Sequence, residues 1–321
     1  MYHMWCEILH RRKYKTDYKT KYSMKKILLI DCDALCWHVF HGMPPLTHEE
    51  RGTSVIYGFL NNLFELQTFN NADRIAFAWD SKKSKRRKLF PGYKAKRRAA
   101  KKEYTEEELE IHKDRIRQFR ALRRSILPKL GFSNNFMTRG LEGDDIIASI
   151  ALEYRDTSTV KIIARDGDLF QLLNPQCTMF DLAKRTTIDE EYFFEKYGIY
   201  PDMWGEVKSI AGCVTDEVPG IYNVGNDRAI QYLLGNMKTT SVLYKRIVSN
   251  PEILELTKKL TVLPYKGTPT YTLKSDTCTV GKLKKVAREF GLQSYLSRER
   301  LKQFRGYFCN GNQTNTEKEI T

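Results

Sequence analysis

Short apolar runs that each end beside an acidic residue form the most regular pattern in the chain. Three runs follow this pattern: Ile27–Ile30 before Asp31, Ile75–Trp79 before Asp80, and Val160–Ala164 before Arg165 and Asp166. Each run is about five residues long and rich in β-forming side chains, and helical sequence separates the runs. This alternation predicts an α/β fold with a parallel sheet, in which the working site lies beyond the carboxyl ends of the strands.

Helical patterns fill the chain between the second and third runs. Thr105 and Glu108 have the spacing of a capping box, apolar residues then recur at helical intervals, and Gly131 follows as a stop signal. These features predict one or two helices over residues 104–130, packed on the sheet. A second helix with an apolar face begins near Ile146, so Glu142, Asp144 and Asp145 are predicted in or beside its first turn, where the helix dipole favours negative charge.

Beyond about residue 192, strand-like runs fade and helical segments dominate. Two helices are predicted over residues 206–212 and 227–234, joined by a turn that contains Pro219, Gly220 and Gly225. Backbone N–H groups in such a turn can hold a phosphate without reading sequence, although many helix pairs of this kind only pack together. Further helices are predicted between residues 251 and 305.

The composition favours a polyanionic partner. The 321 residues carry a formal net charge of +15 and are 41% hydrophobic, which supports a folded core. Nucleic acid is the simplest partner, and a basic surface that serves only solubility is the alternative. The seven cysteines show no CxxC pair, which is typical of reduced intracellular thiols. We expect a cytoplasmic protein, because the sequence shows neither a signal peptide nor an apolar run of about 18–20 residues.

Eight acidic residues lie near the predicted strand ends and turns. A single aspartate at a strand end is usually a helix cap, but a set of carboxylates without counterions repels itself and favours bound divalent metal. Oxygen ligands suit Mg²⁺ or Mn²⁺, and two such ions can support an in-line phosphoryl displacement. If residues 166–168 are extended, both of their acidic side chains point to one face. The candidate ligands are Asp31, Asp80, Glu142, Asp144, Asp145, Asp166, Asp168 and Asp216.

Basic residues crowd the segment from 82 to 102, directly after Asp80. Such a run is often only a solvated face, but here it begins at a candidate metal ligand and is predicted to overhang the site. Its cations would neutralise phosphates, and the interleaved Phe90 and Tyr93 are suited to stacking on bases. Lys94 and Arg87 are the candidates for contact with the scissile phosphate.

These blocks, in this order, resemble the 5′-nucleases of the flap endonuclease superfamily, especially bacteriophage 5′–3′ exonucleases and the 5′-nuclease domain of bacterial DNA polymerase I. The resemblance covers roughly residues 25–234. It rests on five blocks: Ile30-Asp31-Cys32-Asp33, Trp79-Asp80, Arg87 with Tyr93-Lys94, Leu141-Glu142-Gly143-Asp144-Asp145, and Asp166-Gly167-Asp168. One residue fewer than usual separates Arg87 from Tyr93, so Arg86 is an alternative for the arginine role. Asp33 stands where other members have Ser or Asp.

The resemblance implies an Mg²⁺-dependent 5′–3′ exonuclease and structure-selective flap endonuclease of DNA replication or repair. Its expected fold is a PIN-like parallel sheet flanked by helices, with a C-terminal helix–hairpin–helix region. Expected partners are branched or 5′-ended DNA and RNA–DNA primers, bound by a monomer, with replication proteins unidentified and K⁺ at the hairpin. The expected DNA-binding residues are Arg86, Tyr93, Lys96, Arg97, Gly220 and Gly225.

The implied organisation has four parts. Residues 1–23 are expected to form a disordered basic extension, with Met24 as a candidate start, and residues 309–321 a disordered tail. Residues 24–191 are expected to form the metal-dependent nuclease domain, with a basic arch at about 82–120. Residues 192–308 are expected to form a helical DNA-binding region, with its helix–hairpin–helix at about 206–234.

The chain departs from the family pattern in the hairpin block. Cys213 stands where a metal-binding aspartate is usual, Glu217 replaces an asparagine, Asn223 a glycine and Asp227 a lysine. Because a thiol is a poor ligand for Mg²⁺, this departure weakens the prediction of a second Mg²⁺. Two alternatives remain open: a degenerate protein that binds branched DNA and cuts it weakly, and a PIN-type ribonuclease.

Overall fold

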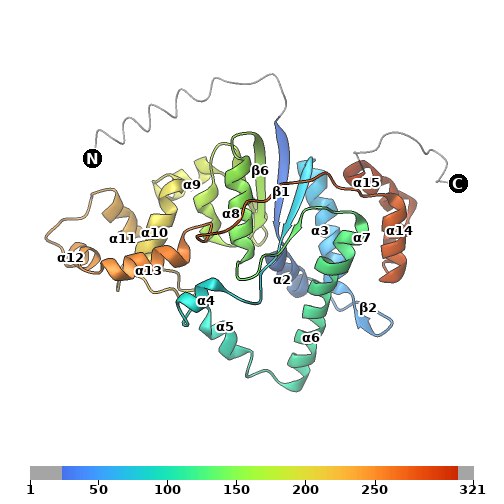
Figure 1. Cartoon of the computed structure of the whole chain (residues 1–321), viewed down its shortest axis with the longest axis horizontal. Helices are drawn as coiled ribbons and strands as arrows, with labels where there is room; N and C mark the ends of the chain where they lie inside the picture. The colour runs from blue at the N-terminus through green and yellow to red at the C-terminus, as the bar shows by residue number, and fades with distance from the viewer. Residues whose placement is uncertain (1–23, 310–321) are drawn as a thin grey trace.

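A six-stranded sheet forms the centre of the computed structural model, which describes residues 24–309 (Figure 1). The strand order is β5-β4-β1-β6-β7-β8, and every neighbouring pair is parallel except β7 and β8. The strands are β1 (Lys25–Asp31), β4 (Arg74–Ala78), β5 (Asn135–Phe136), β6 (Ser158–Ala164), β7 (Cys177–Asp181) and β8 (Thr186–Ile188). The three predicted strands are confirmed as β1, β4 and β6, which lie side by side at the centre of the sheet.

Helices cover both faces of this sheet and enclose two separate apolar cores. Residues from β1 and β4 contribute to each core, because successive strand side chains point to opposite faces. One face is covered by α2 (Cys32–Gly42), α3 (Ser54–Asn70), η1 (Leu122–Ile126), α7 (Leu127–Leu130), α14 (Val280–Glu289), η4 (Gln293–Leu296) and α15 (Arg298–Phe308). The other is covered by α8 (Gly143–Tyr154), η2 (Gly167–Leu172), α9 (Glu190–Tyr197), α10 (Trp204–Ala211), α11 (Asn226–Leu233) and α13 (Pro251–Thr261).

The two predicted helices of the later part of the chain correspond to α10 and α11. The chain turns between them at Gly220, where a Cβ atom would lie only 2.0 Å from the carbonyl oxygen of Ala211. A glycine is therefore required for this close approach. The remaining small elements are β2 (Thr47–His48), β3 (Arg51–Gly52), η3 (Pro201–Met203) and α12 (Val242–Val248).

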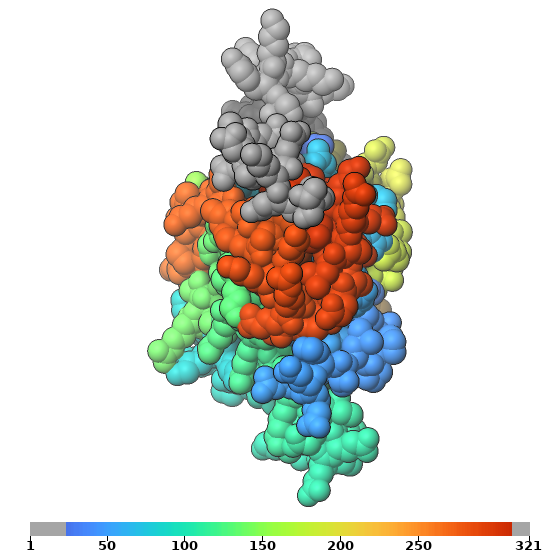
Figure 2. Space-filling model, turned by 90° about the vertical axis from the view of Figure 1, so that its right-hand side faces the viewer, coloured from blue at the N-terminus to red at the C-terminus, as the bar shows by residue number. Residues whose placement is uncertain are grey.

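A helical segment projects beyond the edge at which the parallel strands end (Figure 1). It consists of α4 (Lys85–Leu89), α5 (Ala95–Ala100) and the first turns of α6 (Glu106–Ala121), and we call it the projecting segment. Figure 2 shows the turn between α5 and α6 standing out from the body of the molecule. Thr105 and Glu108 form the predicted capping box, and α6 continues through η1 and α7 to Gly131, which has a φ of +101°. The predicted helix over residues 104–130 is thus confirmed.

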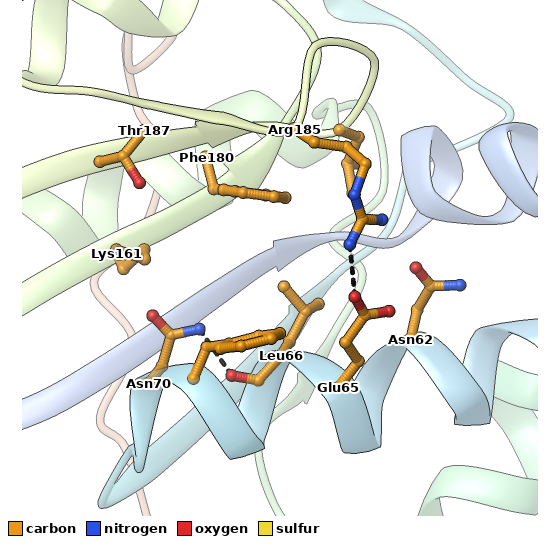
Figure 3. Close-up of a pocket in the computed structure, with 10 residues that line it drawn as sticks. Asn62, Glu65, Leu66, Asn70, Lys161, Phe180, Arg185 and Thr187 are labelled. Carbon is orange, nitrogen blue, oxygen red and sulfur yellow. Dashed lines mark hydrogen bonds and ion pairs between the residues drawn. The ribbon is translucent and has the colours of Figure 1, made fainter.

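A pocket of about 320 Å³ lies between α3 and strands β6 to β8 (Figure 3). Leu66 and Phe180 line it with apolar surface, and Arg185 donates a hydrogen bond to Glu65 beside it. None of the eight candidate metal ligands lines this pocket. It is therefore separate from the site to which the sequence points.

The predicted extension at residues 1–23 and residues 310–321 of the predicted tail lie outside the described residues. The candidate start at Met24 stays a prediction. The division between a nuclease domain and a DNA-binding region stays a prediction. Within the described part, α14 and α15 pack on the core that β1, β4 and α3 also form. The last helices of the second predicted region therefore share a core with the first.

Candidate metal centre and nucleic-acid interface

The three central strands bring their acidic residues to one edge of the sheet. Asp31 is the last residue of β1, and Asp80 and Asp166 each follow two residues after the ends of β4 and β6. Since β1 lies between β4 and β6, these three carboxylates converge. Helix α8 begins at the same edge, where the backbone N–H of Gly143 donates to Oδ1 of Asp80 at 2.7 Å. That hydrogen bond ties the start of α8 to the end of β4.

Mutual repulsion and burial shift the pKa values of these acids upward. Burial, followed by the charge of Asp80, raises the pKa of Asp31 to about 7. Burial, followed by Asp168, raises the pKa of Asp166 to about 6. Burial and Asp166 hold the pKa of Asp144 well above its usual range. These carboxylates therefore lack sufficient positive charge nearby, and a divalent cation would supply it.

Asp144 is set apart by its lack of partners. No hydrogen bond or ion pair joins its carboxylate to any other residue in the part of the chain that the structure describes. It lies in the first turn of α8 and lines a small hollow together with Glu142, Asp168 and Asp216. The four acidic side chains that line this hollow offer carboxylate oxygens, a donor type that suits a hard divalent cation, and Arg86 and Tyr93 are also in its lining. The structure thus brings four of the eight candidate ligands together around one space.

Asp145 has a different environment from the one predicted. Arg86 donates to both of its carboxylate oxygens, at 2.7 and 2.8 Å, and both side chains are buried. The backbone N–H groups of Glu142 and Tyr265 donate to the same two oxygens, at 3.0 and 2.8 Å. The remaining guanidinium donor of Arg86 reaches the carbonyl oxygen of Leu260 at 2.8 Å.

These contacts give Asp145 and Arg86 other partners than the metal and DNA that the sequence predicted for them. The lone pairs of Asp145 are already occupied in a buried, bidentate ion pair, so the carboxylate is not free to bind metal in this arrangement. Arg86 is likewise buried, and its guanidinium contacts Asp145 and the carbonyl oxygen of Leu260. Of the two arginines considered for a phosphate contact, Arg87 is the exposed one. The pair instead fixes α4 to the start of α8.

The projecting segment places Lys94 directly against the acids. The Lys94 ammonium lies 2.8 Å from Glu142 and 3.4 Å from Asp216, and its own backbone N–H donates to the carbonyl oxygen of Asp216 at 2.9 Å. Burial opposes the charge on Lys94, but Glu142 raises its pKa well above the usual range. Arg97 pairs with Asp216 at 2.9 Å. Lys94 therefore stays charged at neutral pH beside the candidate metal ligands.

Tyr93 is buried here, whereas the sequence suggested a stacking surface. Its hydroxyl donates to Glu142 at 2.7 Å and to Asp216 at 3.1 Å, and its ring packs with Cys213, Val218 and Leu260. In this conformation Tyr93 anchors the projecting segment to the hairpin block, and its ring does not face a base.

A cationic hollow of about 170 Å³ opens next to Lys94. It is lined by Ser84, Arg87, Tyr93, Lys94, Arg97, Arg98, Lys101 and Glu142. Several cations around one space of this size provide a place for a phosphate. The predicted phosphate contacts Lys94 and Arg87 are both in its lining, while Lys96 is exposed on α5 and its backbone N–H donates to Glu217 at 2.9 Å.

A second cluster overlaps the hollow around Asp144, because it shares Asp168 and Asp216 with it and adds Cys213. One ligand atom from each of Asp168, Cys213 and Asp216 falls within 4.8 Å of the others, so Cys213 indeed occupies a ligand position beside two aspartates. The sequence suggested an extended segment at residues 166–168, but the structure shows a turn there. Asp166 caps the 3₁₀-helix η2 by accepting from the N–H of Asp168 at 2.9 Å, which turns the chain between the two acids.

The hairpin between α10 and α11 lines a third space, of about 470 Å³. Gly220 and Gly225 both contribute to it, and a Cβ atom added at Gly225 would meet nothing within 4 Å. The start of α11 is therefore open, as a phosphate contact requires. Asp227, in the first turn of α11, adds a negative charge there.

Two residues that contact the candidate ligands were not among the candidates named from the sequence. Lys208 pairs with Asp168 at 3.1 Å, and Asp33 accepts a hydrogen bond from the backbone N–H of Asp80 at 2.8 Å. Lys208 lies in an ordinary amphipathic helix and carries no local signal. Asp33 stands two residues after Asp31, so its position near the strand end was the available signal.

Comparison with known proteins agrees with this geometry. Residues 26–198 match the family model of the 5′–3′ exonuclease N-terminal, resolvase-like domain. The chain belongs to this 5′–3′ exonuclease family. It is 28% identical to a 5′–3′ exonuclease of Aquifex aeolicus, over 85% of this chain and 94% of that protein. It is 32% identical to DNA polymerase I of Rhizobium leguminosarum, over 70% of this chain but only 21% of that much longer relative.

A solved structure shares the fold. The flap endonuclease of bacteriophage T5, in a complex with DNA and metal ions, superposes with a TM-score of 0.65 at 18% identity, over 87% of this chain and 99% of that one. The predicted PIN-like α/β fold is confirmed by this likeness and by the mostly parallel sheet. Within residues 24–309, no helix is both long and apolar enough to cross a membrane.

Proposed function

We propose that this protein is an Mg²⁺-dependent 5′–3′ exonuclease and structure-selective 5′-flap endonuclease, with Mn²⁺ as an alternative ion. The observation that carries the proposal is the position of Lys94, which lies between a cluster of carboxylates and a cationic hollow. A metal-binding surface and a phosphate-binding surface thus meet at one side chain. Family membership and the structural likeness to a flap endonuclease support the same activity.

In this proposal, one group of residues binds the metal ions and another binds the phosphate. Asp31, Asp80, Glu142 and Asp144 hold the first cation, and Asp166, Asp168 and Asp216 lie toward the second. When bound, the cations activate the attacking water and neutralise charge on the phosphate. Lys94, whose charge is maintained by Glu142, stabilises the negative charge that develops on the phosphate oxygens, and Arg87 binds the same group from the hollow.

The free protein holds Lys94 and Arg97 on the carboxylates that metal would bind. Binding of DNA and metal therefore requires an exchange of partners. Lys94 and Arg97 would leave the carboxylates and contact phosphates instead. The carboxylates would then be free to bind divalent ions. This exchange predicts that binding of metal and binding of DNA strengthen each other.

The substrate is proposed to be branched or 5′-ended DNA and RNA–DNA primers, held by a monomer. The projecting segment grips the strand near the site, and the hairpin at Gly220 and Gly225 holds the duplex through backbone N–H groups, with K⁺ as a candidate ion there. Participation in DNA replication fits the DNA polymerase I relatives, and replication partners remain to be identified.

Cleavage of matched substrates separates this proposal from its rivals. The proposed enzyme releases labelled product from a DNA 5′ flap in Mg²⁺ and cuts an intact blunt duplex much more slowly. Tight flap binding without product in metal would identify a degenerate binding protein instead. Preference for an all-RNA flap over the DNA flap would favour a PIN-type ribonuclease.

Changing Asp227 to lysine is expected to strengthen binding of flap DNA several-fold at low salt. Asp227 is exposed in the first turn of α11 beside the open hairpin, where its charge repels phosphate. Glu299→Lys makes the same charge change in the first turn of α15 and serves as the matched control. Equal gains for both variants in a fluorescence anisotropy titration would show that only net charge matters and would contradict the proposed role of the hairpin.

A further inference from the structure

The cluster of Asp168, Cys213 and Asp216 has a different donor set from the hollow around Asp144. Its three ligand atoms, two carboxylate oxygens and one sulfur, lie within 4.8 Å of one another. They come from two separate parts of the chain, because Asp168 belongs to η2 and the other two residues to the turn after α10. Folding therefore assembles a mixed oxygen and sulfur site from distant sequence positions.

The backbone holds Cys213 and Asp216 in this arrangement. Cys213 and Val218 exchange two backbone hydrogen bonds, at 3.1 and 2.9 Å, and close the turn that contains Asp216. Gly212, just before it, has a φ of +73° and lies against the backbone at Gly220, so the turn has little freedom to shift. Cys213 is 7% exposed, and its sulfur lies 3.1 Å from the hydroxyl of Thr215.

The surroundings of Cys213 are apolar on one side and charged on the other. Tyr93, Val218 and Leu260 pack with it in a small apolar cluster, while Asp168 and Asp216 face its sulfur. Lys208, on α10, pairs with Asp168 at 3.1 Å, while Arg97 and Lys94 pair with Asp216 at 2.9 and 3.4 Å. A sulfur enclosed in this way is shielded from water but accessible to an ion held by the two carboxylates.

The ligand atoms of Asp168, Cys213 and Asp216 favour some divalent ions over others. Mg²⁺ prefers six oxygen ligands and keeps several waters, so a sulfur in its ligand set lowers its affinity. Zn²⁺ and related thiophilic ions such as Cd²⁺ and Co²⁺ accept sulfur and carboxylate oxygen together. The donor set at Cys213 thus does not fit the magnesium ion that the family implies for the second position.

We propose that Asp168, Cys213 and Asp216 form a binding site for one thiophilic divalent cation of the Zn²⁺ class. On binding, the Cys213 thiol would give its proton to solvent and its sulfur would bond to the ion. Lys208 would release Asp168, and Arg97 and Lys94 would release Asp216. The mixed site at Cys213 then shares Asp168 and Asp216 with the hollow around Asp144, whose other acidic side chains offer only oxygen. This inference deepens the proposed function and rests on its metal-dependent site.

Titration with Cd²⁺ tests the inference without any nuclease reaction. Thiolate bound to Cd²⁺ absorbs in the ultraviolet through charge transfer, so the measurement reports sulfur ligation directly. The parent protein carries Cys6→Ser and Cys309→Ser, because the other described cysteines besides Cys213 (Cys32, Cys36, Cys177 and Cys278) are buried in the fold. The titration is made in excess Mg²⁺, with circular dichroism as the check of folding.

The parent is expected to show a charge-transfer band that saturates at one Cd²⁺ per chain and persists in Mg²⁺. Cys213→Ser and Cys213→Asp should both lose the band. Asp168→Asn should retain the band but require roughly tenfold or more Cd²⁺ for half-saturation, because it removes a second ligand. Absence of the band in the folded parent, its survival in Cys213→Ser, or unchanged affinity in Asp168→Asn would each overturn the inference.

These outcomes are independent of cleavage. If the band behaves as expected but no flap is cut in any metal, the ion site stands and the proposed nuclease function fails. If flap DNA is cut in Mg²⁺ but no band forms, the function stands and the thiophilic site fails.

Discussion

Replacing Asp144 with asparagine is expected to lower metal-dependent flap cleavage by roughly 10³-fold or more. Asp144 has no partner of its own among the described residues and lies in the hollow that Glu142, Asp168 and Asp216 share. Its carboxylate is therefore available to metal, and its loss removes a ligand without breaking any contact seen in the fold. Turnover of a labelled 5′ flap at saturating Mg²⁺ measures the effect.

The folding stability of Asp144→Asn should be unchanged or higher, although its cleavage activity is lower. Burial and neighbouring acids raise the pKa of Asp144, so its charged form costs folding free energy as pH rises. Asparagine removes that charge, and the thermal midpoint of the metal-free variant should be equal to or above that of the wild type near neutral pH.

Asp145→Asn is the contrasting control at the adjacent position. It leaves the buried Arg86 without its bidentate partner, which costs about 3–5 kcal/mol of folding stability. We expect a lower thermal midpoint for Asp145→Asn and a stable but inactive Asp144→Asn. If the two variants exchanged these properties, the assignment of Asp144 to metal and Asp145 to Arg86 would be wrong.

Lys94→Met is expected to reduce turnover by about 10²–10³-fold, the loss typical for a group that stabilises transition-state charge. The ammonium of Lys94 lies 2.8 Å from Glu142 and lines the cationic hollow, so it is placed to contact a phosphate held by metal at that cluster. Single-turnover cleavage at saturating enzyme and Mg²⁺ separates this effect from weaker DNA binding.

Lys285→Met supplies the matched control for Lys94→Met. Lys285 is exposed on α14, outside both the projecting segment and the hairpin, so its loss changes net charge equally without touching the site. Equal single-turnover rates for the two variants would remove Lys94 from the mechanism and leave it as a structural ion pair.

The centre of the sheet was predictable because its strands are continuous apolar runs. β1, β4 and β6 are buried on both faces, so each appears in the sequence as an uninterrupted run that ends near an acid. The strands that were missed carry weaker patterns. β5 is only two residues long, and β7 alternates buried and partly exposed positions that include Thr178.

The position of the acidic residues at one sheet edge was also predictable, but their pairing with basic residues was not. Strand ends and the start of α8 placed Asp31, Asp80, Asp144 and Asp166 correctly at one edge, since that follows from sheet geometry alone. The bidentate pair between Arg86 and Asp145 joins residues far apart in sequence, and neither residue type shows which partner it takes. Burial of Tyr93 depends in the same way on the hairpin block, which packs against it only in the folded chain.

The most direct test of the account is cleavage of an end-labelled 5′-flap DNA, with and without Mg²⁺, by the wild type and by Asp80→Ala. Asp80 follows β4 and accepts a hydrogen bond from Gly143 at the start of α8, at the centre of the candidate metal ligands. Product is expected only from the wild type in Mg²⁺, and flap binding is expected to be retained by Asp80→Ala. Cleavage in the absence of divalent metal, or cleavage by Asp80→Ala at the rate of the wild type, would contradict it.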